Sequence, residues 1–367
     1  QKQINLLFKK LSMKRKNLVV RKVNQKESFF KNKKTLNFYN NFKKIINKNI
    51  KNKNFAIAVS GGSDSLCLAY FSKLYSLETG SKIHTLIVDH NIRKEARKES
   101  LKVQGILKKK GISSRILRWG KDGPKKNIQK NARDIRYSLI SKYCSKNKVK
   151  YLVTAHHSDD QIENFLIRLL RGSGITGLSS MSTNSKFNSS LKIIRPFLNL
   201  KKKDLKYVTL NYFKTYIKDP SNNDEKFLRT RIRKYKKNME QEGLDTNKIV
   251  NTVENLLSAK EALVFYKNKA IYKHASFISK HKCIINKNVF SEEAGEIIFK
   301  FFSDILSLVS ETYYPPRSKK IVSLINRLKK KQFTKSTLGK CIVEEKDNFI
   351  IISKEFKINK MPYQLEK

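Results

Sequence analysis

The sequence is 367 residues long, enough for two or three domains that each have a hydrophobic core. It contains 80 Lys and Arg residues against 30 Asp and Glu residues, which gives a formal net charge of +50 at pH 7. This excess predicts a polyanionic partner, with nucleic acid ahead of an anionic membrane, although a compositional bias towards Lys, Asn and Ile accounts for part of it. No apolar run approaches the roughly 20 residues that a membrane span needs, so we expect no membrane partner.

The cysteines indicate a reducing compartment. Cys67, Cys144, Cys283 and Cys341 lie far apart and include no Cys-x-x-Cys pair. This spacing argues against a zinc knuckle, a redox dithiol and a disulfide scaffold. We therefore expect a cytoplasmic protein.

Residues 1–50 are basic and poor in acids, and we expect an N-terminal extension that is solvated or touches RNA. A transit peptide is the alternative, whereas the lack of an apolar signal segment argues against secretion. Within this stretch, residues 37–50 favour a basic helix with Phe42 and Ile46 on one side. We expect removal of residues 1–36 to leave activity largely intact.

A glycine-containing loop between a predicted strand and a predicted helix indicates an anion site. Residues 55–59 are apolar or small and predict a strand buried in a parallel sheet, and residues 66–71 favour a helix. Between them stand Ser60, Gly61, Gly62, Ser63, Asp64 and Ser65. Glycines let the backbone approach a ligand, serines donate hydroxyls, and free amides at a helix N-terminus attract anions. The loop lacks the spacing and the lysine of a Walker A motif, and an ordinary capped turn is the plainer alternative.

Strand-like and helix-like stretches alternate from residue 55 to about residue 198, which predicts a doubly wound α/β domain with a parallel sheet. A second predicted strand, residues 84–88, ends in Asp89 and His90. Ligands of such sheets bind beyond the carboxyl ends of the strands. We therefore favour a ligand role for Asp89 and His90 over an ordinary loop.

A third predicted strand, residues 151–155, delivers two histidines and two acids to the same edge of the sheet. These residues are His156, His157, Asp159 and Asp160. A single buried histidine is usually a satisfied core residue, but a His-His-x-Asp-Asp cluster after a strand favours a functional site. Ser158 and Gln161 have the spacing of a capping box for the helix that follows. A zinc site is possible on residue types alone, but the sequence offers no fourth ligand at a spacing typical of zinc sites.

The remaining segments are mostly helical and basic. Residues 127–147 predict a helix with Arg133, Arg136 and Tyr137 on one face, and a solvated basic face is its simplest interpretation. Residues 225–235 predict an arginine-bearing helix. Beyond them we expect amphipathic helices near 247–273, 291–309 and 318–330 and a β-hairpin within 336–355.

The loop sequence SGGSDS matches the SGGxDS signature of the N-type ATP pyrophosphatases, or PP-loop enzymes. Further stretches resemble the tRNA(Ile)-lysidine synthase family. They are VDHNIR (88–93), ARDIRY (132–137), TAHHSDDQIENFLIRLLRGSGITGLSSM (154–181), RPF (195–197), DPSNNDEKFLRTRIR (219–233) and STLGKCIVEE (336–345). The resemblance is strong over residues 50–235 and weak in the tail. Asn164 departs from the threonine that is more usual in the family.

The resemblance implies an ATP-dependent ligase that acts on tRNA(Ile) with a CAU anticodon. Cytosine O2 of C34 attacks the α-phosphate of ATP, pyrophosphate leaves, and the ε-amine of L-lysine then displaces AMP from C2. The product, lysidine, changes decoding from AUG to AUA. The family also permits a homodimer.

The resemblance implies roles for individual residues. The loop from Ser60 to Ser65 would bind ATP, with Asp89 and His90 beside it. Asp64 and Asp160, with His156 nearby, would orient lysine, and Asp64 would also meet Mg²⁺. We expect Arg133, with Arg136 as the alternative, to stabilise phosphate or adenylate charge. The catalytic set is therefore Asp64, Arg133, His156 and Asp160.

The domains that we expect are a basic extension (1–50), a catalytic domain (51–235), a helical tRNA-binding domain (236–310) and a small tRNA-binding domain of mixed α+β structure (311–367).

Three other functions stay open. A PP-loop tRNA thiolase would use the same ATP chemistry but usually needs paired cysteines. Small-molecule amidating enzymes such as NAD or GMP synthetases need no such basic chain. A non-catalytic RNA-binding protein leaves the acid-histidine cluster unexplained.

Overall fold

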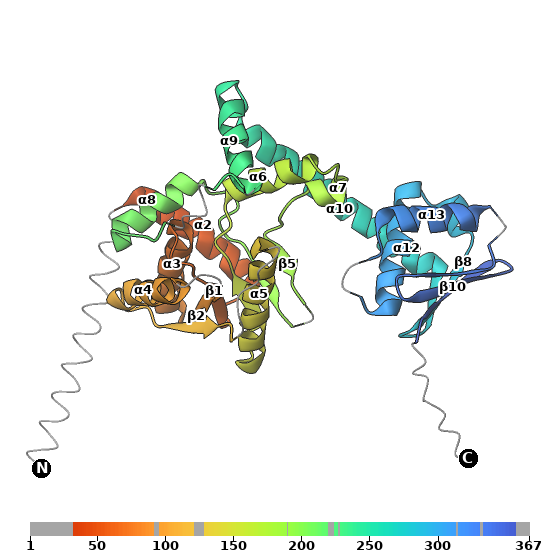
Figure 1. Cartoon of the computed structure of the whole chain (residues 1–367), viewed down its shortest axis with the longest axis horizontal. Helices are drawn as coiled ribbons and strands as arrows, with labels where there is room; N and C mark the ends of the chain where they lie inside the picture. The colour runs from red at the N-terminus through yellow and green to blue at the C-terminus, as the bar shows by residue number, and fades with distance from the viewer. Residues whose placement is uncertain are drawn as a thin grey trace, which may run out of the picture. The chain divides into compact units, whose positions relative to one another are not determined.

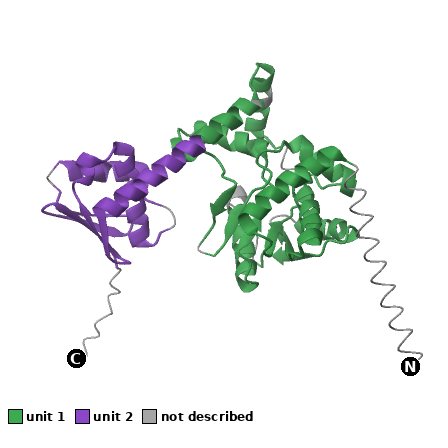
Figure 2. Ribbon diagram, turned by 180° about the vertical axis from the view of Figure 1, so that it is seen from behind, with its two compact units in different colours: residues 1–255 green, residues 256–367 purple. Residues whose placement is uncertain are grey.

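The computed structural model describes residues 32–91, 95–120, 128–188, 190–218, 224–226, 228–312, 315–330 and 333–356. Part of the VDHNIR stretch and the predicted turn at 219–223 lie outside these residues. The chain divides into two compact units, residues 1–255 and 256–367 (Figure 2). Among the described residues, no helix has the length and apolar character to cross a membrane.

The first unit is built on a six-stranded sheet with the order β3-β2-β1-β4-β6-β5 (Figure 1). Its strands are β1 (Phe55–Ala58), β2 (Ile83–Asp89), β3 (Ser114–Arg118), β4 (Tyr151–Val153), β5 (Asn184–Lys186) and β6 (Lys192–Ile194). All pairs are parallel except that of β5 with β6. Ile57 of β1 is in register with Thr85 on one side and Val153 on the other. The predicted parallel-sheet α/β fold is confirmed.

Helices cover both faces of this sheet, because successive strand residues point to opposite faces. The covering helices are α2 (Lys33–Ile50), α3 (Ser63–Thr79), α4 (Ala96–Lys109), α5 (Ile128–Lys146) and α8 (Lys202–Phe213). The first unit also contains α6 (Ser158–Leu169), α7 (Ile175–Leu178) and α9 (Leu228–Gln241), of which α7 and α9 contact α6. Phe55 and Ile57 face the core formed with α2, α3, α4 and α8. Ala56 faces a smaller core in which Ile140 and Cys144 of α5 pack.

Helix α2 belongs to the core of the first unit, which corrects the expected extension over residues 1–50. Its apolar residues recur at helical spacing, and Phe42 and Ile46 are buried. The ring of Phe42 lies 5.7 Å from that of Phe71 and 5.8 Å from that of Phe197. The helix begins earlier than we expected, because the side chain of Asn32 caps it.

The second unit has one core under one sheet, of order β7-β8-β11-β10-β9. The strands are β7 (Ala275–Ser279), β8 (Lys282–Asn286), β9 (Lys335–Leu338), β10 (Cys341–Lys346) and β11 (Phe349–Lys354), and the helices are α11 (Val289–Glu292), α12 (Gly295–Ser310) and α13 (Ser318–Lys329). Helix α10 (Thr246–His274) contributes residues to both units. The expected hairpin is present, with Lys346 opposite Phe349. Strands β8 and β11 pair, so residues on both sides of residue 310 share one sheet, although we expected a boundary there. The tRNA-binding roles of residues 236–310 and 311–367 stay predictions.

Candidate active site at the carboxyl edge of the first sheet

Strand order brings three loops together. β1 lies between β2 and β4, so the loops that follow these three parallel strands meet at one edge. The strand order reverses between β1 and β4, and ligands of open α/β sheets bind at such a switch point. The three loops carry SGGSDS, Asp89 with His90, and His156 with His157, which is the arrangement that we expected.

The loop after β1 depends on Gly61. Its φ of +88° lies in the left-handed region, and a Cβ atom there would come within 2.5 Å of Val103 Cγ2. The carbonyl of Gly61 accepts a hydrogen bond from the amide of Ile217 at 2.9 Å. The hydroxyl of Ser65 accepts from the Ser60 amide at 3.2 Å and donates to the Gly62 carbonyl at 3.0 Å. The loop is thus folded tightly on its own hydrogen bonds.

The N-terminus of α3 is open to an anion. Gly62 is its N-cap residue and has no side chain to satisfy the first amides of the helix. Thr209 of α8 donates to the carbonyl of Ser63 at 2.6 Å and holds the first turn in place. The hydroxyl of Ser63 donates to Asp64 at 2.9 Å. A cradle that excludes a Cβ atom and presents free helix amides fits the phosphates of ATP.

His157 is the centre of the polar cluster. Its Nε2 atom lies 3.6 Å from Asp64 Oδ2 and 3.5 Å from Asp160 Oδ2, and its Nδ1 atom lies 3.7 Å from Asp159 Oδ2. Only 3% of the residue is exposed. The buried ring therefore faces three carboxylates that come from two loops.

The charges of this cluster shift its pKa values in opposite directions. Burial acts to lower the pKa of His157, but Asp64, Asp160 and Asp159 outweigh it, so the pKa is raised. Burial acts to raise the pKa of Asp160, but the two histidines and Arg229 outweigh it, so the pKa is lowered. Both shifts favour the charged forms of His157 and Asp160.

His156 has a different environment from its neighbour. Its Nδ1 atom lies 2.9 Å from the hydroxyl of Thr154. Burial lowers the pKa of His156 to about 3, Arg195, Arg133 and Arg229 lower it too, and Asp160 opposes them. The imidazole is thus neutral at pH 7. Sequence reasoning selected His156 and gave no role to His157, whose ring contacts Asp64.

Helix α9 supplies cations that sequence reasoning did not assign to the site. Arg233 Nε lies 2.6 Å from Glu163 Oε1, and Arg229 Nε lies 3.3 Å from Glu163 Oε2. Arg229 also lies 3.8 Å from Asp160. The sequence did contain a signal for this role: Arg229 and Arg233 are four residues apart, which places both on one face of the helix.

The loop after β2 meets helix α5. His90 Nε2 lies 3.3 Å from the guanidinium of Arg136, and burial followed by the charge of Arg136 lowers the pKa of His90 to about 4. Asp89 is buried and accepts from the amide of Asn91 at 3.0 Å. Arg133 lies over the ring of Tyr137, at 5.2 Å from its centroid. Arg136 therefore contacts the loop after β2, whereas the ring contact of Arg133 is with its own helix, and both arginines are exposed. The role of Arg133 in the site stays a prediction.

The capping box of α6 uses other residues than we expected. The carboxylate of Asp160 accepts from the amide of His157 at 3.2 Å. Ser158 instead donates to the Leu200 carbonyl at 2.9 Å, and Gln161 bonds to the backbone of Met181. The prediction of a Ser158–Gln161 box was wrong, because both side chains hold neighbouring loops.

A divalent cation would need the substrate as a ligand. Among the described residues, no group of three or more His, Cys, Asp and Glu side chains could hold a metal ion. Mg²⁺ commonly binds through one or two carboxylates together with phosphate oxygens. The Asp64 carboxylate, 25% exposed in the first turn of α3, fits that requirement beside the ATP loop.

Comparison with known proteins decides the family. Residues 34–238 match the family described as the PP-loop domain. The chain is 34% identical over 314 residues to a tRNA(Ile)-lysidine synthase of Orientia tsutsugamushi (strain Boryong), a match that covers 83% of this chain and 70% of that protein. The chain belongs to the tRNA(Ile)-lysidine synthase family.

A second member of the lysidine synthase family, from Wolbachia pipientis wMel, is 33% identical over 330 residues, or 88% of this chain and 76% of that protein. Among solved structures, the U34-tRNA thiolase NcsA from Methanococcus maripaludis with its [4Fe-4S] cluster is similar in fold. It has a TM-score of 0.51 and 20% sequence identity, over 64% of this chain and 80% of the thiolase. The predicted family and its PP-loop architecture are confirmed, and the thiolase likeness concerns the fold alone.

Proposed function

We propose that this chain is the ligase that joins L-lysine to C2 of cytidine 34 in the CAU anticodon of tRNA(Ile), with ATP as co-substrate. The observation that carries the proposal is the similarity to named tRNA(Ile)-lysidine synthases along more than four-fifths of the chain. The cradle at Gly61 and the carboxylates around His157 support it, because they supply an anion site beside a cation site. The excess of positive charge suits an RNA substrate.

The reaction has two steps. O2 of the cytosine attacks the α-phosphate of ATP, the bond to the β-phosphate oxygen breaks, and pyrophosphate leaves. The ε-amine of lysine then attacks C2, and AMP departs with the former O2. The amine gives up a proton to become a nucleophile, since its ordinary pKa is about 10.4.

In this proposal the loop from Ser60 to Ser65 holds the phosphates. Mg²⁺ bound by Asp64 and the phosphates would neutralise phosphate charge. Asp64 and Asp160 bind the lysine ammonium and orient it, and neutral His156 adds a hydrogen-bonding group without repelling a cation. Arg133 stabilises phosphate or adenylate charge.

The test is incorporation of labelled lysine into a CAU-anticodon tRNA(Ile) transcript, with a C34→U transcript as the control. Incorporation that needs both ATP and C34 supports the proposal. Pyrophosphate release without lysine transfer would contradict it and keep only the PP-loop chemistry. Sedimentation of the protein with and without tRNA tests the homodimer, which is the assembly that the family permits.

The role of Asp64 has its own test, which is the Mg²⁺ dependence of pyrophosphate release. An Asp64→Asn variant should need a higher Mg²⁺ concentration for half-maximal release. Chelation with EDTA should stop release in both proteins. An unchanged Mg²⁺ dependence would remove Asp64 from the metal site.

A thiolase is the second candidate, and the cysteines argue against it. All four are free and buried. Burial raises the pKa of Cys144 and of Cys283 to about 12, which keeps both thiols protonated and poor nucleophiles at neutral pH. Sulfur transfer to tRNA in the presence of ATP and a sulfide donor would revive this alternative.

A further inference from the structure

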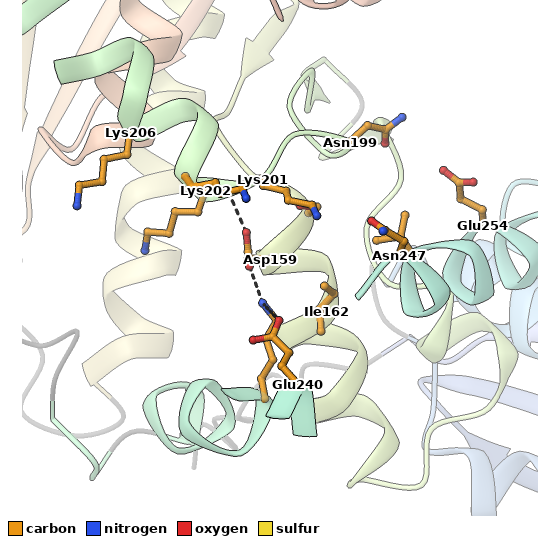
Figure 3. Close-up of a pocket in the computed structure, with 13 residues that line it drawn as sticks. Asp159, Ile162, Asn199, Lys201, Lys202, Lys206, Glu240, Asn247 and Glu254 are labelled. Atoms are coloured by element: carbon orange, nitrogen blue, oxygen red, sulfur yellow. Dashed lines mark hydrogen bonds and ion pairs between the residues drawn. The ribbon is translucent and has the colours of Figure 1, made fainter. Parts of the chain in front are cut away.

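A cavity of about 730 Å³ lies in the first unit, between α6, α8, α9 and the start of α10 (Figure 3). Ser158 and Asp159 of α6 form part of its wall. Lysines from the beginning of α8 form another part, and Asn247 and Glu254 lie opposite. None of the roles proposed above uses this cavity.

The cavity has a surplus of positive charge. Lys201, Lys202, Lys203 and Lys206 all line it. Among the described residues, none of these four lysines has an ion pair with an acidic side chain. The wall holds five lysines against three acids, Asp159, Glu240 and Glu254. Two of these acids share Lys236, which lies 2.6 Å from Asp159 and 3.3 Å from Glu240. The α8 lysines are therefore left to attract an anion from outside.

The first amide of α8 does not provide the anion site. The amide of Lys202 donates to Asp159 at 2.9 Å, so the protein has capped this helix with its own carboxylate. The other oxygen of Asp159 accepts from the ammonium of Lys236 at 2.6 Å. Binding must then come from the lysine side chains, which meet phosphates as mobile point charges.

The size and place of the cavity indicate the ligand. Its volume lies within the range of pockets that enclose whole small molecules, well above the need of a single phosphate. Its wall begins at Ser158, directly after His157, whose ring contacts Asp64 of the ATP loop. His157 contacts Asp64 with Nε2 and Asp159 of the cavity wall with Nδ1, so the cavity adjoins the predicted site.

We propose that this lysine cavity binds backbone phosphates of the anticodon arm of the tRNA substrate, an inference that rests on the proposed function. Several phosphates bound by lysines contribute affinity and register without reading sequence. Reading of C34 then falls to the residues of the reaction centre. A free phosphate or pyrophosphate is the competing occupant of the same lysines.

The experiment measures tRNA affinity of the full chain as a function of salt. The cavity variant is Lys201→Gln/Lys203→Gln/Lys206→Gln. The matched control is Lys142→Gln/Lys146→Gln/Lys150→Gln, which removes the same charge from exposed positions around the start of β4, at the opposite edge of the sheet. Both proteins are first compared with the wild type by urea unfolding, so that a folding defect is recognised.

We expect the dissociation constant of the cavity variant for CAU-tRNA(Ile) to rise at least about tenfold. The plot of log affinity against log salt has a negative slope, and its steepness should decrease by about two, since each lost phosphate contact reduces the slope by somewhat less than one. The control should change by no more than about threefold. The isolated anticodon stem-loop should reproduce the difference.

Three results would overturn the inference. Equal losses in the two variants would mean that only net charge matters. A loss for whole tRNA but not for the stem-loop would place another part of the tRNA in the cavity. Unchanged tRNA affinity, together with loss of the thermal stabilisation that pyrophosphate gives to the wild type, would assign the lysines to a small anion.

Failure of the proposed function would look different. The wild-type protein would then transfer no lysine to any tRNA. The binding comparison needs no turnover, so it still reports whether the cavity meets RNA.

Discussion

The Nε2 atom of His157 lies 3.6 Å from a carboxylate oxygen of Asp64, and this contact joins the loop after β4 to the loop after β1. The same nitrogen lies 3.5 Å from Asp160. One imidazole ring thus bridges two acids that approach from different strands. The ring keeps the two carboxylates within reach of one nitrogen.

Replacement of His157 by Ala should strongly destabilise the first unit. The change removes the ring that Asp64, Asp159 and Asp160 share, and loss of one partner from a fully buried ion pair costs roughly 3–5 kcal/mol. The cost here should lie below that range, because Asp64 is 25% exposed and Asp159 and Asp160 keep Lys236 and Arg229 as neighbours. Fluorescence of the single tryptophan, Trp119 at the end of β3, during urea unfolding measures this loss. His84→Ala is the control, since His84 bonds to the neutral hydroxyl of Tyr143 and lies edge-on to its ring, with no carboxylate partner among the described residues, and should cost much less.

Asp160→Asn should impair lysine transfer far more than adenylation. The amide keeps the shape of the side chain but lacks the charge that binds the lysine ammonium and assists its deprotonation, a contribution of about 10²–10⁴ in rate. Two assays separate the steps. The rate of lysine transfer and the KM for lysine report the second step, and pyrophosphate release in the absence of lysine reports the first. Glu225→Gln serves as the control, because Glu225 is exposed and pairs with Lys234. Full transfer with an unchanged lysine KM would refute the role of Asp160.

Gly61→Ala should abolish tight ATP binding and lower the stability of the first unit by at least about 1–2 kcal/mol. Its left-handed φ disfavours any side chain, and the new methyl would meet Val103. Gly105→Ala in α4 is the opposite case, because nothing lies within 4 Å of its would-be Cβ atom. That variant should gain about 0.5–1 kcal/mol from the reduced entropy of the unfolded chain. Isothermal titration with ATP and urea unfolding test both.

Removal of residues 1–31 should leave kcat at saturating tRNA nearly unchanged, whereas removal of residues 1–50 should yield a protein that does not fold. The longer deletion strips α2 from Phe71 and Phe197. The deletion of residues 1–36 that the sequence suggested takes away the Asn32 cap and the first turn of α2, and should cost about 1 kcal/mol. Circular dichroism and lysine transfer distinguish the three proteins. A folded, active protein without α2 would contradict its place in the core.

Local patterns were sufficient for most of the first unit. The buried strands and the glycine loop have short-range signatures, and parallel strands bring their ends together whatever the details of packing. Asp64, Asp160 and the two histidines could therefore be placed at one edge before the structure was known. The sequence favoured His156 and could not show that His157 is the histidine in contact with Asp64, because the side to which each ring points depends on packing.

Long-range packing explains what the sequence left out. The composition of α2 is that of a solvated basic helix, and only the aromatic surface of α3 and Phe197 decides that its apolar stripe is buried. The role of α9 depends on Glu163, which precedes Arg233 by 70 residues in the chain. In the second unit, the helices and the hairpin were each expected from the sequence. Their assembly on one five-stranded sheet with one core was not.

The ATP loop is completed by residues that leave the ribosome long after it. Thr209, 146 positions beyond Ser63, holds the first turn of α3, and the amide of Ile217 bonds to Gly61. A nascent chain that ends before α8 has the whole signature but lacks both supports. The ability to bind nucleotide should therefore arise late in synthesis, when the rest of the sheet is already made, and a prematurely terminated chain should not sequester ATP.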